Sequence, residues 1–151
     1  MLEGCELYEL DHGIKFHGVQ TKAQSIRIRG KLGFPANHPM LDHFRFLKQN
    51  TKLVPKMTIP SPSVLHFRLE PNAVAKEAYS DRDSIFGDLA KVYQQAIRAF
   101  YDAGCRYLQF DDTVWAYLCS KEQLKQAAGR GLNVDKLAER YAACINEALK
   151  A

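Results

Sequence analysis

Two acidic residues, Asp111 and Asp112, follow an apolar stretch that contains Leu108 and Phe110. The alternation of apolar and polar residues predicts a β-strand here, and α/β proteins place their ligand sites at the carboxyl ends of strands. Because side chains alternate between the two faces of a strand, Asp111 shares a face with Gln109, and Asp112 shares the other with the apolar residues. We expect Asp111 to lie nearest the mouth of the site, where its carboxylate could bind an ammonium group. Capping of the next turn by either aspartate is an equal alternative.

A second polar group lies in the sequence PSPSVLHFR at residues 60–68, after a strand-like run at residues 54–60. Its two prolines predict a rigid, irregular segment. The hydroxyls of Ser61 and Ser63 and the ring of His66 are candidates for polar contacts with a ligand. A plain structural connection is an equal alternative for this segment, and a histidine between two apolar residues is more often a satisfied core residue than a ligand.

The four cysteines are spread through the chain without the closely spaced pairs that are typical of zinc sites. They are Cys5, Cys105, Cys119 and Cys144. The last three lie within or beside apolar runs, which favours core positions. We expect reduced thiols, because the N-terminus lacks the pattern of a secretory signal, and we expect no complete zinc site within this chain.

The elements that must position these residues begin with two extended segments, residues 14–19 and 25–32, joined by a polar stretch that favours a hairpin. In the second segment Ile26 and Ile28 face one way, while the basic residues between and after them face the other. A short helix is expected after Pro39.

Farther along the chain, strand and helix patterns alternate, which implies parallel strands that are covered by helices. The strongest helix pattern spans residues 84–103, with Asp83 as a candidate cap and Gly104 at the end. Two later helices are expected, one capped by Ser120 and one by Asn133. About three such units are too few for a closed barrel, which needs roughly 250 residues. The chain is therefore either an open α/β domain or part of a barrel.

Composition and charge exclude several classes of protein. The 151 residues are 46% hydrophobic and 25% charged, which is ordinary for one globular domain. The 21 basic residues exceed the 17 acidic ones by four, but the charges are mixed instead of clustered, so we expect no nucleic-acid partner. No apolar run approaches the roughly 18 residues that a membrane span requires. We expect a cytoplasmic protein with no membrane association.

Two sequence segments resemble the cobalamin-independent methionine synthase family, in its short bacterial branch. They are TIPSPSVLHFR at residues 58–68 and GCRYLQFDDTVWAYLC at residues 104–119. The second resembles the family's barrel strand Q-(I/V)-D-E-P-A, whose first acidic residue binds the amino group of homocysteine. Asp111 matches that residue and Gln109 matches the glutamine. Asp112 replaces the family's glutamate and Thr113 replaces its proline, so the match is to a divergent branch.

The resemblance implies that residues 1–151 form a single partial domain of a (β/α)8 barrel, with about three β-α units after an N-terminal hairpin-like segment. The implied activity is that of 5-methyltetrahydropteroyltriglutamate-homocysteine S-methyltransferase, a zinc-dependent methyl transfer to the homocysteine thiol in methionine biosynthesis. The implied partner is a homocysteine-like amino-acid substrate. The residues expected to bind it are Asp111, Gln109, Ser61, Ser63 and His66.

The resemblance also implies that the chain lacks the family's zinc ligands, a His-x-Cys pair, a glutamate and a further cysteine that follow the strand matched by Asp111. We therefore expect zinc not to bind fully to this chain and the chain alone to be inactive. Where the family has an aromatic residue that stacks on the folate pterin, this sequence has Pro62. Because that stacking surface is missing, the identity of the methyl donor stays open, with methyltetrahydrofolate as the family's candidate.

Other interpretations remain open at the level of sequence. One is a non-catalytic interaction module or an inactive fragment of such an enzyme, and another is a small hydrolase or lyase that uses Asp111 and His66 as an acid-base pair. In each case we expect a homo-oligomer, because three β-α units would leave a sheet edge unpaired and apolar helix faces uncovered. A compact monomer, in which residues 1–24 fold over the open edge, is the alternative.

Overall fold

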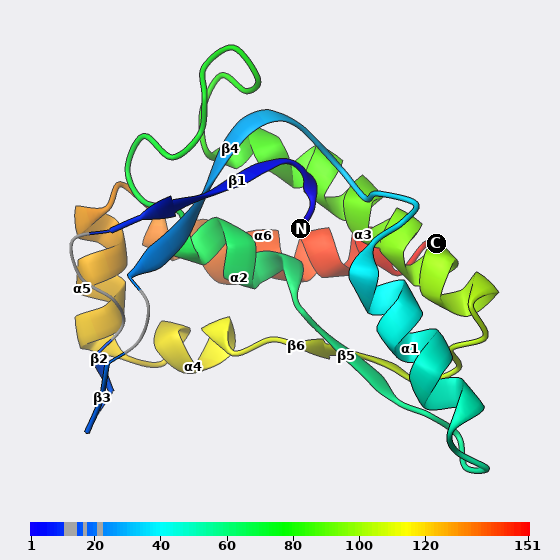
Figure 1. The fold of residues 1–151 in the computed structure, drawn as a ribbon. Coiled ribbons are helices and arrows are strands. Elements are labelled where there is room, and N and C mark those ends of the chain that lie inside the picture. Colours follow the sequence, from blue (N-terminus) through cyan, green and yellow to red (C-terminus); the bar gives the residue numbers. More distant parts are fainter. Residues whose placement is uncertain (11–14, 17, 21–22) are drawn as a thin grey trace.

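The computed structural model describes residues 1–10, 15–16, 18–20 and 23–151 (Figure 1). The strands are β1 (Glu3–Glu9), β2 (Lys15–Phe16), β3 (Val19–Gln20), β4 (Gln24–Gly33), β5 (Met57–Pro60) and β6 (Leu108–Asp111). The helices are α1 (Pro39–Gln49), α2 (Pro62–Arg68), α3 (Phe86–Asp102), α4 (Val114–Leu118), α5 (Lys121–Gly129) and α6 (Leu137–Ala148). Short 3-10 turns, η1 (Asp83–Ile85) and η2 (Val134–Lys136), lead into α3 and α6.

The N-terminal strands pair differently from the predicted hairpin. β4 runs antiparallel to β1, with Glu6 opposite Arg27, and β2 pairs with β3. The expected pairing of residues 14–19 with residues 25–32 is therefore wrong where the structure describes it; Ile14 and His17 lie outside the described residues. A longer ladder, in which Glu6 accepts hydrogen bonds from two arginines of β4, favours the observed partner.

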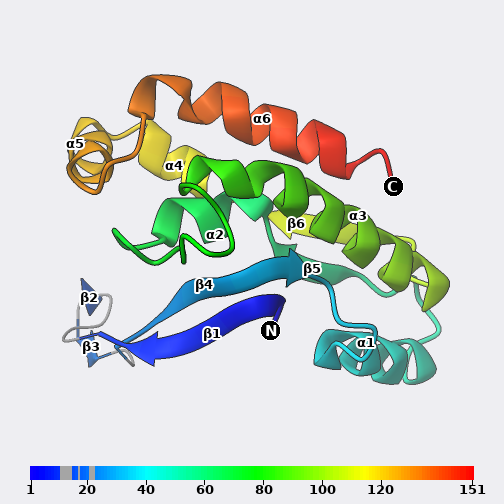
Figure 2. The same ribbon diagram turned by 90° about the horizontal axis from the view of Figure 1, so that it is seen from above.

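The β5–α3–β6 unit has the predicted parallel arrangement. Met57 of β5 lies opposite Leu108 of β6, and the ladder continues to Pro60 opposite Asp111. The apolar face of β6 meets the helices as expected, because the Phe110 ring packs edge-on against a tyrosine of α3. In Figure 2, α6 and α3 lie side by side, and the β1–β4 pair lies on the other side of α3.

Residues 62–68 form a helix, so the prediction of an irregular segment is wrong. Pro62 occupies the first turn of α2, where its fixed φ suits a helix and its missing amide hydrogen costs nothing. The predicted cap of α3 is also wrong. Asp83 accepts hydrogen bonds from other elements, and Asp81 instead accepts from the Ser84 amide at 2.8 Å.

Two of the other predicted helix ends are confirmed, at Gly104 and Ser120, and one is not. Gly104 has a φ of +93°, and its amide donates to the Tyr101 carbonyl at 2.8 Å, as expected for a glycine that ends a helix. Ser120 accepts from the Gln123 amide at 3.3 Å and caps α5. Asn133 makes no side-chain cap bond, so the prediction that it caps the last helix is wrong; the 3-10 turn η2 begins directly after it and leads into α6.

Two apolar clusters hold these elements together. The first joins β4, α1, β5, α3 and the end of α6 and contains Ile28, Phe44, Ile59, Leu89 and Phe100. The second joins α2, α4, α5 and α6 and contains Phe67, Val114, Ala127, Leu137 and Tyr141. Within the described residues the fold is mixed α/β with two-stranded sheets and no closed barrel. No described helix is both long and apolar enough to cross a membrane.

Candidate functional site

A polar cluster forms where β5 and β6 end side by side. Ser61, directly before α2, and Ser63, in its first turn, are fully buried, and their hydroxyl oxygens lie 2.5 Å apart. The Ser63 hydroxyl donates to the Asp112 carboxylate, so its single proton is used there and the Ser61 hydroxyl must donate to Ser63. Two residues that are far apart in the sequence, Ser63 and Asp112, are thereby joined.

Asp112 is held from a second direction. Its other carboxylate oxygen accepts from Trp115 Nε1 at 2.7 Å. Both oxygens of Asp112 therefore have donors from within the chain, one from α2 and one from α4. Asp112 therefore has a structural role, and its carboxylate is not free to bind a ligand. Trp115 was not singled out from the sequence, and only its position three residues after Asp112 could have indicated the contact.

Asp111 differs from its neighbour in that its side chain is exposed. Its backbone carbonyl accepts from the Ser61 amide at 3.2 Å and so continues the parallel ladder. Among the residues that the structure describes, no hydrogen bond or ion pair involves the Asp111 carboxylate. Gln109, on the same strand, is half-buried and accepts from Lys56 Nζ at 3.0 Å. Asp111 thus keeps an available carboxylate at the end of a parallel strand.

His66 lies in the core instead of in the cluster. Its side chain is fully buried between Tyr141 and Asp83. Burial, followed by the nearby charges of Arg82 and Arg140, lowers the pKa of His66 to about 3. The ring is therefore neutral near pH 7. Nδ1 accepts from the Tyr141 hydroxyl at 2.8 Å, and Nε2 donates to Asp83 at 3.2 Å.

The structure brings Ser61 and Ser63 to Asp112, but it does not join His66 to Asp111. The contacts of the His66 ring are with α6, with η1 and with Phe86 of α3. An acid-base pair of Asp111 and His66 finds no geometric support here. Tyr93 is a further residue that the sequence did not single out. Its hydroxyl donates to the Pro60 carbonyl at 2.6 Å, and burial raises its pKa, so it stays a protonated donor that holds the end of β5.

The cysteines occupy separate elements. Cys105 and Cys144 are buried as expected, whereas Cys119 is exposed, so its predicted core position is wrong. α4 has only five residues and buries Val114 alone, which leaves Cys119 beyond its end without core contacts. Among the described residues, no three potential metal ligands gather at one point. Burial raises the pKa of Cys144 to about 11, which disfavours a thiolate. Within the described residues the cysteines therefore do not come together at one point where they could hold a metal ion.

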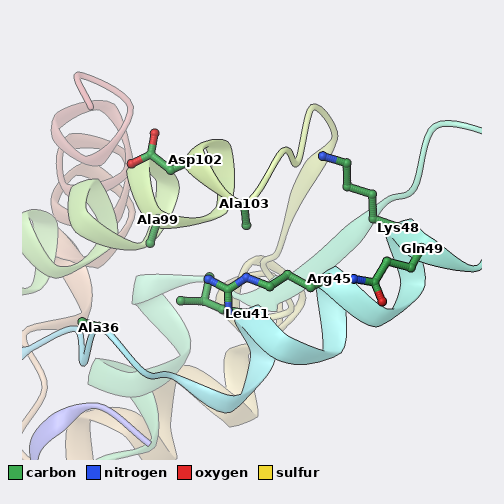
Figure 3. Close-up of a pocket in the computed structure, with 8 residues that line it drawn as sticks. All are labelled: Ala36, Leu41, Arg45, Lys48, Gln49, Ala99, Asp102 and Ala103. Carbon is green, nitrogen blue, oxygen red and sulfur yellow. The ribbon is translucent and has the colours of Figure 1, made fainter.

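Two hollows in the described part of the chain differ in their lining. The larger, of about 880 Å³, lies between β1, β4 and the helices α2 and α3, and its lining is mostly apolar. Its polar lining includes Ser61, Arg68, Glu70, Tyr117 and Arg130. The smaller, of about 670 Å³, lies between α1 and the end of α3 (Figure 3). Arg45 and Lys48 of α1 and Asp102 of α3 line it, and it shares no residue with the larger hollow.

The fold and the polar cluster define a mixed α/β protein with an exposed carboxylate at the carboxyl ends of two parallel strands. No family model matches the chain. Two uncharacterized proteins of Bacillus subtilis are similar to it: YxjG is 44% identical over 150 residues and YxjH is 40% identical over 149 residues. These stretches cover 98% of this chain but only 39% of YxjG and 38% of YxjH.

A solved structure is also similar. It is a Listeria monocytogenes protein that has been provisionally named a vitamin-B12-independent methionine synthase, with a TM-score of 0.73 and 39% identity. The match covers 99% of this chain and 39% of that protein. The chain thus spans about two fifths of the length of the relatives it matches. At this identity and TM-score, the chain is similar in both sequence and fold to a part of that protein.

Proposed function

We propose that this chain forms part of the amino-acid pocket of a methyltransferase that resembles cobalamin-independent methionine synthase. The observation that carries the proposal is the contrast between two adjacent aspartates. The two carboxylate oxygens of Asp112 accept hydrogen bonds from Ser63 and Trp115, whereas the Asp111 carboxylate is exposed at the end of β6. An exposed carboxylate at the end of a parallel strand is placed to bind a ligand's ammonium group.

The other proposed site residues act around Asp111. Gln109, which shares its strand face, is oriented by Lys56 and offers amide hydrogens toward a polar ligand. Ser63 donates a hydrogen bond to Asp112, and Ser61 donates to Ser63. These bonds fix the position of the start of α2 relative to the end of β6. His66 is a positioning residue in this scheme, because its ring ties α2 to η1 and α6. The ligand proposed for this pocket is homocysteine or a similar amino acid.

The surrounding fold is consistent with part of a (β/α)8 barrel. β5, α3 and β6 form one parallel strand-helix-strand unit, which is the repeating unit of such barrels. The solved relative has a similar fold over almost all of this chain. We assign no zinc ligand within this chain, and we propose that any methyl transfer in the whole protein uses ligands outside these residues. The methyl donor stays open, with methyltetrahydrofolate as the candidate.

A non-catalytic interaction module is the second candidate. One observation favours it: the larger hollow, between the β1–β4 pair and the helices α2 and α3, is lined mostly by apolar side chains. Such a surface is suited to burial against another polypeptide. Selective binding of an amino acid at Asp111 would favour the pocket over the module, because an interaction surface needs no ammonium-binding carboxylate.

The test is the substitution Asp111→Asn in this chain, with homocysteine and methionine as ligands. Loss of the charge should weaken binding by about 1.5 to 3 kcal/mol, roughly 10- to 150-fold, which is the scale of a charge-assisted hydrogen bond. Isothermal titration calorimetry measures the affinity. Asp135→Asn, at an exposed aspartate on η2, is the matched control. Equal affinities for Asp111→Asn and the unmodified chain would refute the assignment.

A further inference from the structure

We propose that Arg68 and Arg130, which line the larger hollow, form together with Arg82 an anion-binding site for a small anion with a carboxylate or phosphate group. The hollow shares Ser61 with the proposed amino-acid pocket, but none of the three arginines belongs to that pocket.

Arg68 and Arg130 flank a stacked aromatic pair. The rings of Phe67 and Tyr117 are 5.4 Å apart and nearly parallel. The Arg130 guanidinium lies 5.3 Å from the centre of the Phe67 ring, and the Arg68 guanidinium lies 5.9 Å from that of Tyr117. Each arginine also has one hydrogen bond that fixes its head group, Arg130 to the Phe67 carbonyl and Arg68 to the Tyr117 hydroxyl, both at 3.2 Å. The two cations are therefore oriented in advance at the hollow.

Arg82 supplies an unpaired donor. Its Nη1 atom is buried and has no hydrogen-bond partner in the described structure. A buried guanidinium nitrogen without a partner costs free energy, so an anionic oxygen that accepts a hydrogen bond from it would be stabilising. Burial and the charge of Arg130 both lower the pKa of Arg82, because the two positive charges repel each other. An anion near Arg82 and Arg130 would accept a hydrogen bond from the unpaired nitrogen and would reduce the repulsion between the two positive charges.

The charges around the hollow are not balanced within the described chain. Four other arginines pair with carboxylates: Arg27, Arg29, Arg45 and Arg140. None of the three arginines of the proposed site has such an ion pair among the described residues. Glu70 lines the same hollow and attracts Arg82, but one carboxylate against three guanidiniums leaves a net positive charge. Planar, two-pronged donors of this kind are suited to carboxylate and phosphate oxygens.

Titration with inorganic phosphate and with succinate tests the proposal, followed by NMR of the arginine Nε–Hε signals. We expect saturable shifts at Arg68, Arg82 and Arg130 that weaken as salt is added. The preferred probe distinguishes a phosphate site from a carboxylate site. Neither probe carries an ammonium group, so the result is independent of Asp111. Absence of saturable binding by both probes would overturn the proposal.

Two variants separate binding from folding. Arg68→Gln, at an exposed side chain, should weaken binding of the preferred probe about tenfold, which corresponds to roughly 1.4 kcal/mol. Arg82→Gln should weaken binding similarly but raise the Tm of the free protein, because it removes an unpaired buried donor. A purely structural arginine would instead lower the Tm when replaced. Arg98→Gln, at an exposed arginine of α3 outside the hollow, is the control. Equal binding by all three variants would contradict the site.

Discussion

His66 connects three elements through its two ring nitrogens. Nδ1 accepts from Tyr141 of α6, Nε2 donates to Asp83 of η1, and the ring itself belongs to α2. Arg140 donates to the same aspartate and completes the network. Because α2 also carries Ser61 and Ser63 at its start, the neutral state of one buried histidine supports the geometry of the polar cluster.

The lowered pKa of His66 predicts a loss of stability in mild acid. In the folded chain this pKa is about 3, whereas an unfolded histidine titrates near 6.5. Between these values the unfolded state binds more protons than the folded state, so the free energy of unfolding falls as the pH falls through 6.5. The loss should be about 2 kcal/mol between pH 7 and pH 5. Urea unfolding at a series of pH values measures it.

The control for this prediction is another histidine of the same chain. His66→Gln should be less stable at pH 7 but should lose most of the pH dependence, since the titrating group is gone. His43→Gln, at an exposed position on α1, should keep the dependence of the unmodified chain. A pH dependence that survives in His66→Gln would show that other groups cause it.

At the scale of elements, the β1–β4 pair depends on one glycine. The ladder shifts register between Glu3 and Cys5, and Gly4 occupies the shift with a φ of +75°. A Cβ atom at Gly4 would collide with the Lys31 carbonyl oxygen and would lie 2.6 Å from the Gly30 carbonyl oxygen. Both obstacles are backbone atoms, so no side chain can move aside to make room.

Gly4→Ala should therefore destabilise the chain by about 2 kcal/mol, from the left-handed backbone conformation and the collision with β4 together. Thermal or urea unfolding gives the value. Gly87→Ala is the matched control, because Gly87 lies in α3 with open space around its Cβ position, where alanine should be neutral or stabilising by up to about 1 kcal/mol. Similar stabilities of the two variants would argue against the close approach of Gly4 to the backbone of β4.

At the scale of the whole molecule, much apolar surface is left uncovered. Phe46, Leu53 and Val54 are 69%, 82% and 72% exposed, at the end of α1 and in the connection to β5. In the described residues β5 and β6 pair only with each other, so each has an open edge. Open edges and contiguous apolar side chains favour association. We propose that the chain forms a homodimer or a larger assembly.

Light scattering over a dilution series checks this proposal. We expect a mass of at least two chains that decreases at low concentration. Leu53→Lys should shift the equilibrium toward the monomer, because it places a charge in the exposed apolar surface, whereas Lys52→Gln next to it should change little. A monomer with cooperative unfolding at all concentrations would contradict the proposal and would show that the chain closes its own core.

The local pattern of the sequence determined much of the secondary structure. The alternation around Leu108 and Phe110 predicted β6, the long apolar periodicity predicted α3, and Gly104 predicted where α3 ends. These features were predictable because they depend on residues only a few positions apart: side-chain alternation in a strand, the turn of a helix, and the backbone freedom of one glycine. The same reasoning located the polar residues near the ends of β5 and β6.

Which residues meet was decided only by the tertiary structure. β4 could pair with either of two preceding segments, and the pairing with β1 depends on a register shift at Gly4 and on ion pairs to Glu6. Ser63 reaches Asp112 across 49 positions, and His66 reaches Tyr141 across 75. No local pattern records such partners. That is also why Asp112 is occupied while Asp111 is available: adjacent residues on a strand face opposite sides, and only packing determines what covers each side.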